Sequence, residues 1–292
     1  MREIVKSDSG LKKGVFYVVA TPIGNLEDIT YRAVRILKEV DFIAAEDTRH
    51  TLKLLNHFNI ENRCVSCNEQ NEEKRAIEFL MELDRGKNIA LVSDAGTPLI
   101  SDPGFKIART LIKENIEVIP IPGCSAAIAG LSVAGLPTDS FIFKGFLPKK
   151  KGKRIAVLTG LVNEKSTLIF YESPKRIIKL IEDSIEVFGN RPAMVAREIT
   201  KLYEEYIRGD LSLILHKLKC KNQVKGECSL YIQGIKTEFI VNDNELDSEI
   251  ELELDRSHES GLGTSDIAKK IAAKYSLPRK KVYNRVLKFK NS

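Results

Sequence analysis

The sequence lacks the features that mark several common classes of protein. No window approaches the roughly 20 apolar residues that a membrane-spanning helix needs, and Met1–Lys13 contain no apolar core of a secretory leader. Five cysteines, an odd number in a chain of 292 residues, argue against a disulfide framework and for a reducing compartment. We therefore expect a soluble, cytoplasmic protein that makes no membrane contact and keeps its thiols free.

Sequence fingerprints of metal and nucleotide sites are also missing. Cys64 and Cys67 form a C-x-x-C pair, but neither a second pair nor an H-x-x-x-H completes a zinc site, and we expect no bound metal. The glycine-bearing loops match neither G-x-G-x-x-G nor G-x-x-x-x-G-K-[ST], which excludes the dinucleotide and P-loop fingerprints. The net charge of +6 mildly favours an anionic partner without deciding its nature.

A dense cluster of turn-forming residues follows one apolar run in the first half of the chain. Ile89–Val92 is typical of a buried parallel strand, and the next residues read S-D-A-G-T-P-L-I-S-D-P-G. Glycine lets the backbone approach a ligand and proline fixes φ, so this composition predicts a loop of fixed shape. Ligands bind at the carboxyl ends of strands in open α/β sheets. An ordinary tight connection between a strand and a helix is the alternative.

Two other strand-like runs end in the same kind of loop. Val15–Ala20 precedes Thr21–Leu26, and Ile116–Ile121 precedes Pro122–Ala127. Helix-like segments separate the strands, and this βαβα alternation predicts a parallel sheet with helices on both faces. Loops at the same edge of such a sheet predict one shared crevice.

Charged residues follow a further short strand at Asp41–Ala45. Glu46, Asp47 and Arg49 stand where a helix is expected to begin. A carboxylate at that place can simply cap the helix and interact with its dipole, and this alternative is as good as a functional one for Asp47. Glu46 and Arg49 are the better functional candidates.

The pattern changes near Phe141, where we expect a domain boundary after residue 143. Ala193–Arg197 and Leu202–Arg208 are consecutive strand-like segments without a helix between them, which indicates a mixed or antiparallel sheet. The sequence thus predicts a parallel-sheet domain over residues 1–143 and a second α/β domain with a mixed sheet over 144–235.

Two stretches are strongly charged. The run Lys149–Arg154 is expected to be a basic loop that either grips phosphates or is a solvated surface. Residues 236–292 are expected to form an acidic linker and a basic helical extension, which contacts RNA or is a solvated helix pair. Within it, the capping box of Ser248 and Glu251 favours a helix over Glu249–Asp255, although acidic and apolar residues alternate there as in a strand.

Six motifs, in order between Gly14 and Gly234, resemble those of the tetrapyrrole methylase superfamily, in the branch that methylates ribosomal RNA. They are V-A-T-P-I-G-N-L-E-D-I-T, A-A-E-D-T-R-H, L-V-S-D-A-G-T-P-L-I-S-D-P-G, F-Y-E-S-P, A-R-E-I-T-K and K-G-E. The resemblance implies that S-adenosyl-L-methionine is the cofactor and that the chain methylates a cytidine ribose 2′-hydroxyl in 16S rRNA, at the decoding centre of the small ribosomal subunit. It also implies a tetrapyrrole methylase-like fold and a homodimer.

The resemblance and the charged strand ends together give the expected site residues. The cofactor is expected to bind at Pro22, Ser93, Asp94, Gly96, Thr97, Pro98, Ser125, Ala126, Tyr171, Ala196 and Glu227. The acceptor hydroxyl is expected to lie among Glu46, Arg49, Glu172, Glu198 and Lys201, although no single base is chosen. Arg49, Arg197 and Lys201 could instead hold phosphate. RNA is expected to bind at Lys149, Lys150, Lys151, Lys153, Arg154, Lys280, Lys281 and Arg285.

The substrate has two alternatives. The superfamily also methylates porphyrin-like macrocycles, and fold alone does not fix the substrate. A non-catalytic RNA-binding protein could keep the same fold. The A-T-P-I-G-N-L and S-D-A-G-T-P motifs, A-A-E-D-T-R-H and the basic C-terminal segment favour methylation of RNA.

Overall fold

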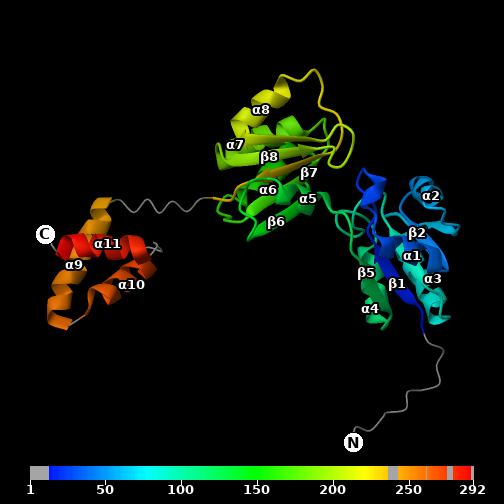
Figure 1. Ribbon diagram of the computed structural model, residues 1–292, viewed down its shortest axis with the longest axis horizontal. Coiled ribbons are helices and arrows are strands. Elements are labelled where there is room, and N and C mark those ends of the chain that lie inside the picture. The colour runs from blue at the N-terminus through cyan, green and yellow to red at the C-terminus, as the bar shows by residue number, and fades with distance from the viewer. Residues whose placement is uncertain (1–12, 236–242, 261, 275–278, 291–292) are drawn as a thin grey trace, which may run out of the picture. The chain divides into compact units, whose positions relative to one another are not determined.

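The computed structural model describes residues 13–235, 243–260, 262–274 and 279–290. The chain divides into two compact units, Met1–Ile235 and Lys236–Ser292. The first unit contains two sheets of five strands each, and helices lie against both (Figure 1). None of the helices in these described ranges is long and apolar enough to cross a membrane.

The first sheet is parallel throughout, as predicted, with strand order β3-β2-β4-β1-β5. Its strands are β1 (Val15–Val19), β2 (Phe42–Ala45), β3 (Cys64–Ser66), β4 (Ile89–Val92) and β5 (Glu117–Ile121). The segments between and after them form the short 3₁₀ helix η1 (Leu26–Asp28) and the helices α1 (Tyr31–Glu39), α2 (Thr48–His57), α3 (Glu72–Asp84), α4 (Phe105–Lys113) and α5 (Ala126–Ser132).

Helices cover both faces of this sheet because their apolar residues recur on one side. In α1, Leu37 packs with Ile43 of β2 and Leu55 of α2 on one face. On the other face, Phe79 of α3 and Leu111 of α4 pack against the sheet. Burying both faces leaves the loops at the carboxyl ends of the strands as the exposed part of the sheet.

The second sheet is mixed, as predicted, with order β6-β7-β10-β8-β9, in which only β6 and β7 run parallel. Its strands are β6 (Phe141–Phe146), β7 (Thr167–Glu172), β8 (Pro192–Arg197), β9 (Glu205–Asp210) and β10 (Cys228–Ile232). Helices α6 (Lys151–Thr159), α7 (Ile177–Phe188) and α8 (Leu211–Lys219) pack on one face.

Three sequence-based boundaries differ from the structure. The expected domain boundary after residue 143 falls inside β6, which pairs with β7 on both sides of a register shift between Phe143 and Gly145. Strand β9 begins at Glu205 rather than Leu202, because the preceding residues form a loop in which Thr200 has φ of 66°. The expected basic loop Lys149–Arg154 is partly helical, since α6 begins at Lys151.

Helix α5 packs against the second sheet although it follows the last strand of the first sheet. Tyr231 of β10 is fully buried, and its hydroxyl donates to the Ala126 carbonyl at 2.7 Å. The Tyr171 hydroxyl accepts a hydrogen bond from the Ala127 N–H at 3.0 Å. A Cβ at Gly130 would lie 2.0 Å from the Tyr231 hydroxyl oxygen. Glycine at 130 therefore lets the helix approach the sheet closely enough for these bonds.

The second unit is built from α9 (Asp243–Ser260), α10 (Thr264–Lys274) and α11 (Arg279–Lys290). A helix covers Glu249–Asp255, which confirms the helical alternative for that segment. Ile250 packs with residues of α10 and α11 in a small apolar core. Lys270 donates to Glu253 at 2.7 Å, so acidic α9 and basic α10 are joined by charge as well as by packing.

The close approach at Gly130 predicts opposite effects of alanine at two helical glycines. Gly130→Ala should lower the free energy of unfolding by about 1–3 kcal/mol, because the methyl group overpacks against Tyr231. Gly152→Ala in α6 should raise it by about 0.5–1 kcal/mol, since nothing lies within 4 Å and alanine favours the helix. Urea unfolding of both variants measures the difference. Equal midpoints would contradict the proposed contact.

Candidate active site

A cavity of about 410 Å³ opens at the carboxyl ends of the first sheet and is also lined by the second sheet. From the first sheet and α5 it is lined by Ile23, Glu46, Asp94, Ala95, Gly96, Thr97, Ile100, Ser101, Asp102, Ser125 and Ala126. From the second it is lined by Phe146, Tyr171, Glu172, Ser173, Pro174, Glu227, Cys228 and Ser229. Its volume lies within the range of roughly 300 to 1,000 Å³ that is usual for small-molecule sites.

The loop after β4 has an unusual backbone. Gly96 has φ of 81° and exchanges two hydrogen bonds with Thr21, at 2.9 and 3.0 Å, which ties this loop to the one after β1. Leu99 and Ser101 have φ of 71° and 69°, a region that costs side-chain-bearing residues of order 1–3 kcal/mol each. Such conformations persist only where the surrounding structure imposes them. The loop therefore has the fixed shape that its composition predicted.

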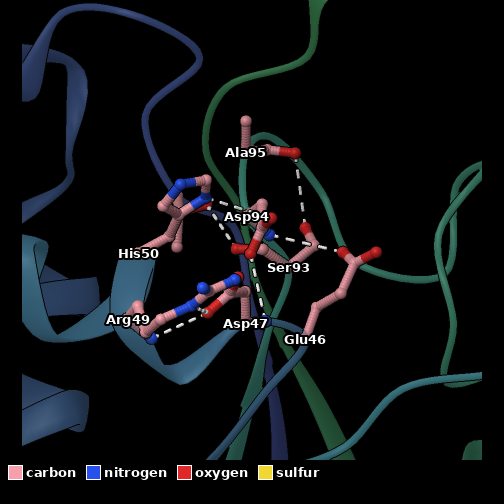
Figure 2. A network of polar contacts seen from close by, with 8 residues as sticks. Glu46, Asp47, Arg49, His50, Ser93, Asp94 and Ala95 are labelled. Carbon is pink, nitrogen blue, oxygen red and sulfur yellow. Dashed lines mark hydrogen bonds and ion pairs between the residues drawn. The ribbon is translucent and has the colours of Figure 1, made fainter.

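A polar network joins the loops after β2 and β4 (Figure 2). The Asp94 carboxylate accepts from the Asp47 N–H at 3.1 Å and lies 3.1 Å from the His50 Nδ1. Asp47 caps α2 by accepting from the Arg49 N–H at 2.9 Å, and its other oxygen lies 2.6 Å from the Arg49 guanidinium. The capping interpretation of Asp47 is thus confirmed. Arg49 extends to solvent, with 84% of its side chain exposed, and does not line the cavity.

Two carboxyl groups in the cavity titrate at unusually high pH. Burial, with added repulsion from the charges of Asp94 and Asp47, raises the pKa of Glu46. Burial, together with repulsion from Glu46, raises the pKa of Asp102 to about 6. By contrast, hydrogen bonds from Arg49 hold the pKa of Asp47 well below its usual range. The cavity thus contains two carboxyl groups that exchange protons closer to neutral pH than ordinary carboxylates.

Glu172 lies at the end of β7 and is engaged within the protein. Its side chain is 1% exposed, one oxygen accepts from the Ser173 N–H at 2.7 Å, and the other lies 2.8 Å from an Arg176 nitrogen. This pair holds the end of β7 to the start of α7.

Glu198, Lys201 and Glu227 form a charged cluster at the ends of β8 and β10. The Lys201 Nζ donates to Glu198 at 3.0 Å and to Glu227 at 3.1 Å, and Glu198 also accepts from the Glu227 N–H at 3.0 Å. Burial opposes the charged form of Glu198, but these hydrogen bonds outweigh it and lower its pKa. Of the three, only Glu227 lines the cavity.

The structure brings most of the expected cofactor residues together. Those that line the cavity are Asp94, Gly96, Thr97, Ser125, Ala126, Tyr171 and Glu227. Pro22, Ser93, Pro98 and Ala196 do not line it. Ser93 is buried and its hydroxyl donates to the Ala95 carbonyl at 3.3 Å, so it shapes the loop from behind (Figure 2). Ala196 is fully buried under α5.

Several lining residues were not nominated from the sequence. Asp102 lines the cavity and belongs to the S-D-P-G turn of the expected loop. In the sequence, its position directly before Pro103 indicates only a turn. Phe146 lies with its ring 5.8 Å from that of Tyr171, a contact between neighbouring strands that the sequence does not reveal. The place of Phe146 in the cavity could therefore be found only from strand pairing.

The basic residues expected to bind RNA divide into three groups. Lys149, Lys150, Lys151 and Lys153 are exposed, whereas Arg154 is 5% exposed and bound to Asp183 at 2.6 Å, so its guanidinium is not available to RNA. Arg285 makes a bidentate pair with Asp247, at 2.6 and 2.8 Å. The side chains of Lys280 and Lys281 lie outside the described residues.

Comparison with known proteins identifies related chains. The family model of tetrapyrrole (corrin/porphyrin) methylases matches residues 15–214. A ribosomal RNA small subunit methyltransferase I from Halalkalibacterium halodurans is 51% identical over 222 residues, 76% of each chain. A protein of the same name from Synechocystis is 45% identical over 271 residues, which are 92% of this chain and 96% of the relative. Another, from Thermotoga maritima, is 44% identical over 221 residues, which are 76% of this chain and 99% of the relative.

Solved structures show the same fold at low identity. The uroporphyrin-III-C-methyltransferase from Thermus thermophilus superposes with a TM-score of 0.55 at 20% identity and covers 76% of this chain and 94% of its own. A cobalt precorrin-4 methyltransferase superposes with a TM-score of 0.56 at 17% identity, covering 75% and 94%. At this identity the likeness concerns the fold of the first unit rather than the substrate.

The raised pKa of Asp102 predicts a pH-dependent gain in stability for Asp102→Asn. Since the folded protein holds this proton to about pH 6 and the unfolded chain only to about pH 3.9, the free energy of unfolding falls as the pH rises between these values. At pH 7 the variant should be more stable by about 1 kcal/mol, after allowance for solvent screening. At pH 3.5 the difference should vanish. Urea titrations at both pH values test this, and a gain of the same size at both would contradict it.

Proposed function

Because the chain belongs to the tetrapyrrole methylases and, among them, to the ribosomal RNA small subunit methyltransferase I proteins, we propose that it methylates 16S rRNA with S-adenosyl-L-methionine as donor. We propose a cytidine ribose 2′-hydroxyl at the decoding centre as the acceptor. The observation that carries the proposal is one cavity lined by both sheets, in a chain with 51% identity to a protein named for this activity. A ribosomal RNA substrate implies that the protein acts in the cytoplasm. That the protein forms a homodimer stays a prediction.

The residues around the cavity fit this cofactor. Ile23, Ala126 and Tyr171 give an apolar wall that suits an adenine ring, and Ser125 and Thr97 offer hydroxyl groups. Asp94 and Asp102 provide carboxyl groups that attract a cationic sulfonium and ammonium. When bound, the cofactor supplies a methyl group on a positively charged sulfur, and the reaction needs no metal.

The protein mainly has to hold the acceptor in line and accept its proton. Arg49, Glu172, Glu198 and Lys201 are each engaged by a partner of opposite charge. Glu46 lines the cavity and has a raised pKa. In the described part of the chain, its carboxylate makes only a long contact of 3.5 Å with the Asp94 N–H. We therefore propose Glu46 as the base, with Glu198 and Lys201 holding Glu227 in place.

Cofactor binding should depend on the backbone conformation that glycine permits at position 96, rather than on the space available there for a side chain. Gly96→Ala should cost roughly 1–2 kcal/mol in strain at φ of 81°, and it should weaken S-adenosylmethionine binding at least tenfold by shifting the loop. Gly189→Ala, at φ of 74° at the end of α7, is the matched control and should lose stability without losing cofactor affinity. Isothermal calorimetry measures both affinities. Equal weakening in the two variants would refute the placement of the cofactor.

Methyl transfer should be specific for RNA and depend on Glu46. With labelled S-adenosylmethionine, the full chain should label 16S rRNA or the small subunit and not a porphyrin-like macrocycle. Glu46→Gln should lower kcat by about 10²- to 10⁴-fold with cofactor affinity unchanged, because a neutral amide cannot accept the proton. Glu39→Gln on α1 is the control, since Glu39 pairs only with Arg35 among the described contacts and should keep full activity. Full turnover by Glu46→Gln would exclude it as the base, and labelling of the macrocycle alone would exclude RNA as substrate.

A further inference from the structure

A second cavity, of about 450 Å³, lies between α6 and α7 on the second sheet. It is lined by Lys149, Lys151, Arg154, Arg176, Lys179, Glu182, Asp183 and Glu186. Each of the two chain segments that line this cavity also lines the active-site cavity a few residues earlier. Phe146 lines the active-site cavity three residues before Lys149, and Pro174 lines it two residues before Arg176. Glu172, which lines the first cavity, lies 2.8 Å from Arg176, which lines the second, so the two cavities are neighbours.

Two arginines fix the loop between β6 and α6. The Arg176 Nη2 donates to the Leu147 carbonyl at 2.7 Å, and the Arg154 Nη1 donates to the carbonyls of Pro148 and Lys149 at 3.3 and 3.0 Å. Three consecutive carbonyl oxygens thus accept hydrogen bonds from these arginines, and Arg154 itself pairs with buried Asp183. These hydrogen bonds fix the backbone of the loop, which the sequence predicts only as a basic loop.

The acidic residues of this cavity are already engaged by cations. Asp183 pairs with Arg154, Glu186 accepts from Lys151 at 3.0 Å, and Glu182 lies 2.6 Å from Lys219 of α8. These carboxylates are therefore less able to neutralise the lysines around them.

We call the other exposed lysines of the two segments that line this cavity, residues 149–153 and 175–179, the lysine face. It consists of Lys149, Lys150, Lys153, Lys175 and Lys179. All five are exposed, and within residues 13–235 none has an ion pair or side-chain hydrogen bond in the structure. Lysine ammonium groups on flexible stems adapt to phosphates in varied positions, and lysine binds phosphate as a point charge.

We propose that the lysine face binds the phosphates of the RNA strand whose ribose enters the active-site cavity. The inference rests on the proposed function. A ribose inside an RNA chain has a phosphodiester on each side, so the strand must leave the cavity across its rim. The lysine face lies on the two segments that follow Phe146 and Pro174 of the active-site cavity, and contacts to the backbone position the strand without reading its sequence.

Salt dependence of RNA binding tests the proposal directly. Lys149→Gln with Lys179→Gln removes one charge from each side of the second cavity. The slope of log affinity for a 16S rRNA transcript against log salt should become shallower by about 1.4 to 1.8, since each phosphate contact contributes roughly 0.7 to 0.9. Lys113→Gln with Lys217→Gln, two exposed lysines on α4 and α8, removes the same total charge and should leave the slope unchanged.

The outcomes separate this proposal from the proposed function. An unchanged slope in Lys149→Gln/Lys179→Gln overturns the lysine face, and so does an equal change in the control, which would show an effect of net charge alone. Binding is measured apart from methyl transfer. Full-length protein that binds RNA with the expected slopes but transfers no methyl group would refute the proposed function and leave the lysine face intact. Calorimetry with S-adenosylmethionine should give the same affinity for both double variants and the original chain.

Discussion

The contact between α5 and the second sheet is the constraint on which the active-site cavity depends. Tyr231 and Tyr171 bind successive backbone groups at the start of α5, and the glycine at 130 admits the Tyr231 hydroxyl against the helix. A buried phenol without a partner would cost about 1–3 kcal/mol, so these bonds specify position as well as stability. Since Ser125 and Ala126 line the cavity, the same bonds place the first sheet's loops opposite the ends of β7 and β10.

Charge is distributed in the cavity according to how each group is engaged. Residues with a close partner of opposite charge, such as Glu172 and Glu198, hold strand ends in place. Glu46 and Asp102 are half-buried carboxyl groups whose neighbours repel their charge, so both hold a proton to higher pH. Groups of this second kind can exchange a proton with a substrate, whereas the first kind contribute fixed positions. This difference, more than residue type, separates the catalytic candidates from the residues that support them.

The sheets and the loops could be predicted from the sequence, but the pairing of side chains could not. The apolar runs predicted β1, β2, β4 and β5 of the first sheet, and consecutive strands without a crossover predicted the mixed second sheet. The loop that carries Asp94 and Gly96 could be predicted because glycine and proline limit the backbone locally. Arg154 could not be separated from its basic neighbours, because its partner Asp183 lies 29 residues away on another helix. Asp102 was missed for a similar reason, since its burial depends on the packing of both sheets around the loop.

The second unit has its own apolar core and its own ion pairs, so contacts within the unit hold it together. The Thermotoga maritima relative is matched almost completely by 221 residues, fewer than the 235 of the first unit, so it does not contain both units in full. The residues that line the cavity that we assign to methyl transfer belong to the first unit. Part of the basic charge of this unit is used internally, since Lys270 and Arg285 bind carboxylates of α9. The lysine face makes no such ion pair within residues 13–235, so its charge is available to the phosphates of an RNA strand.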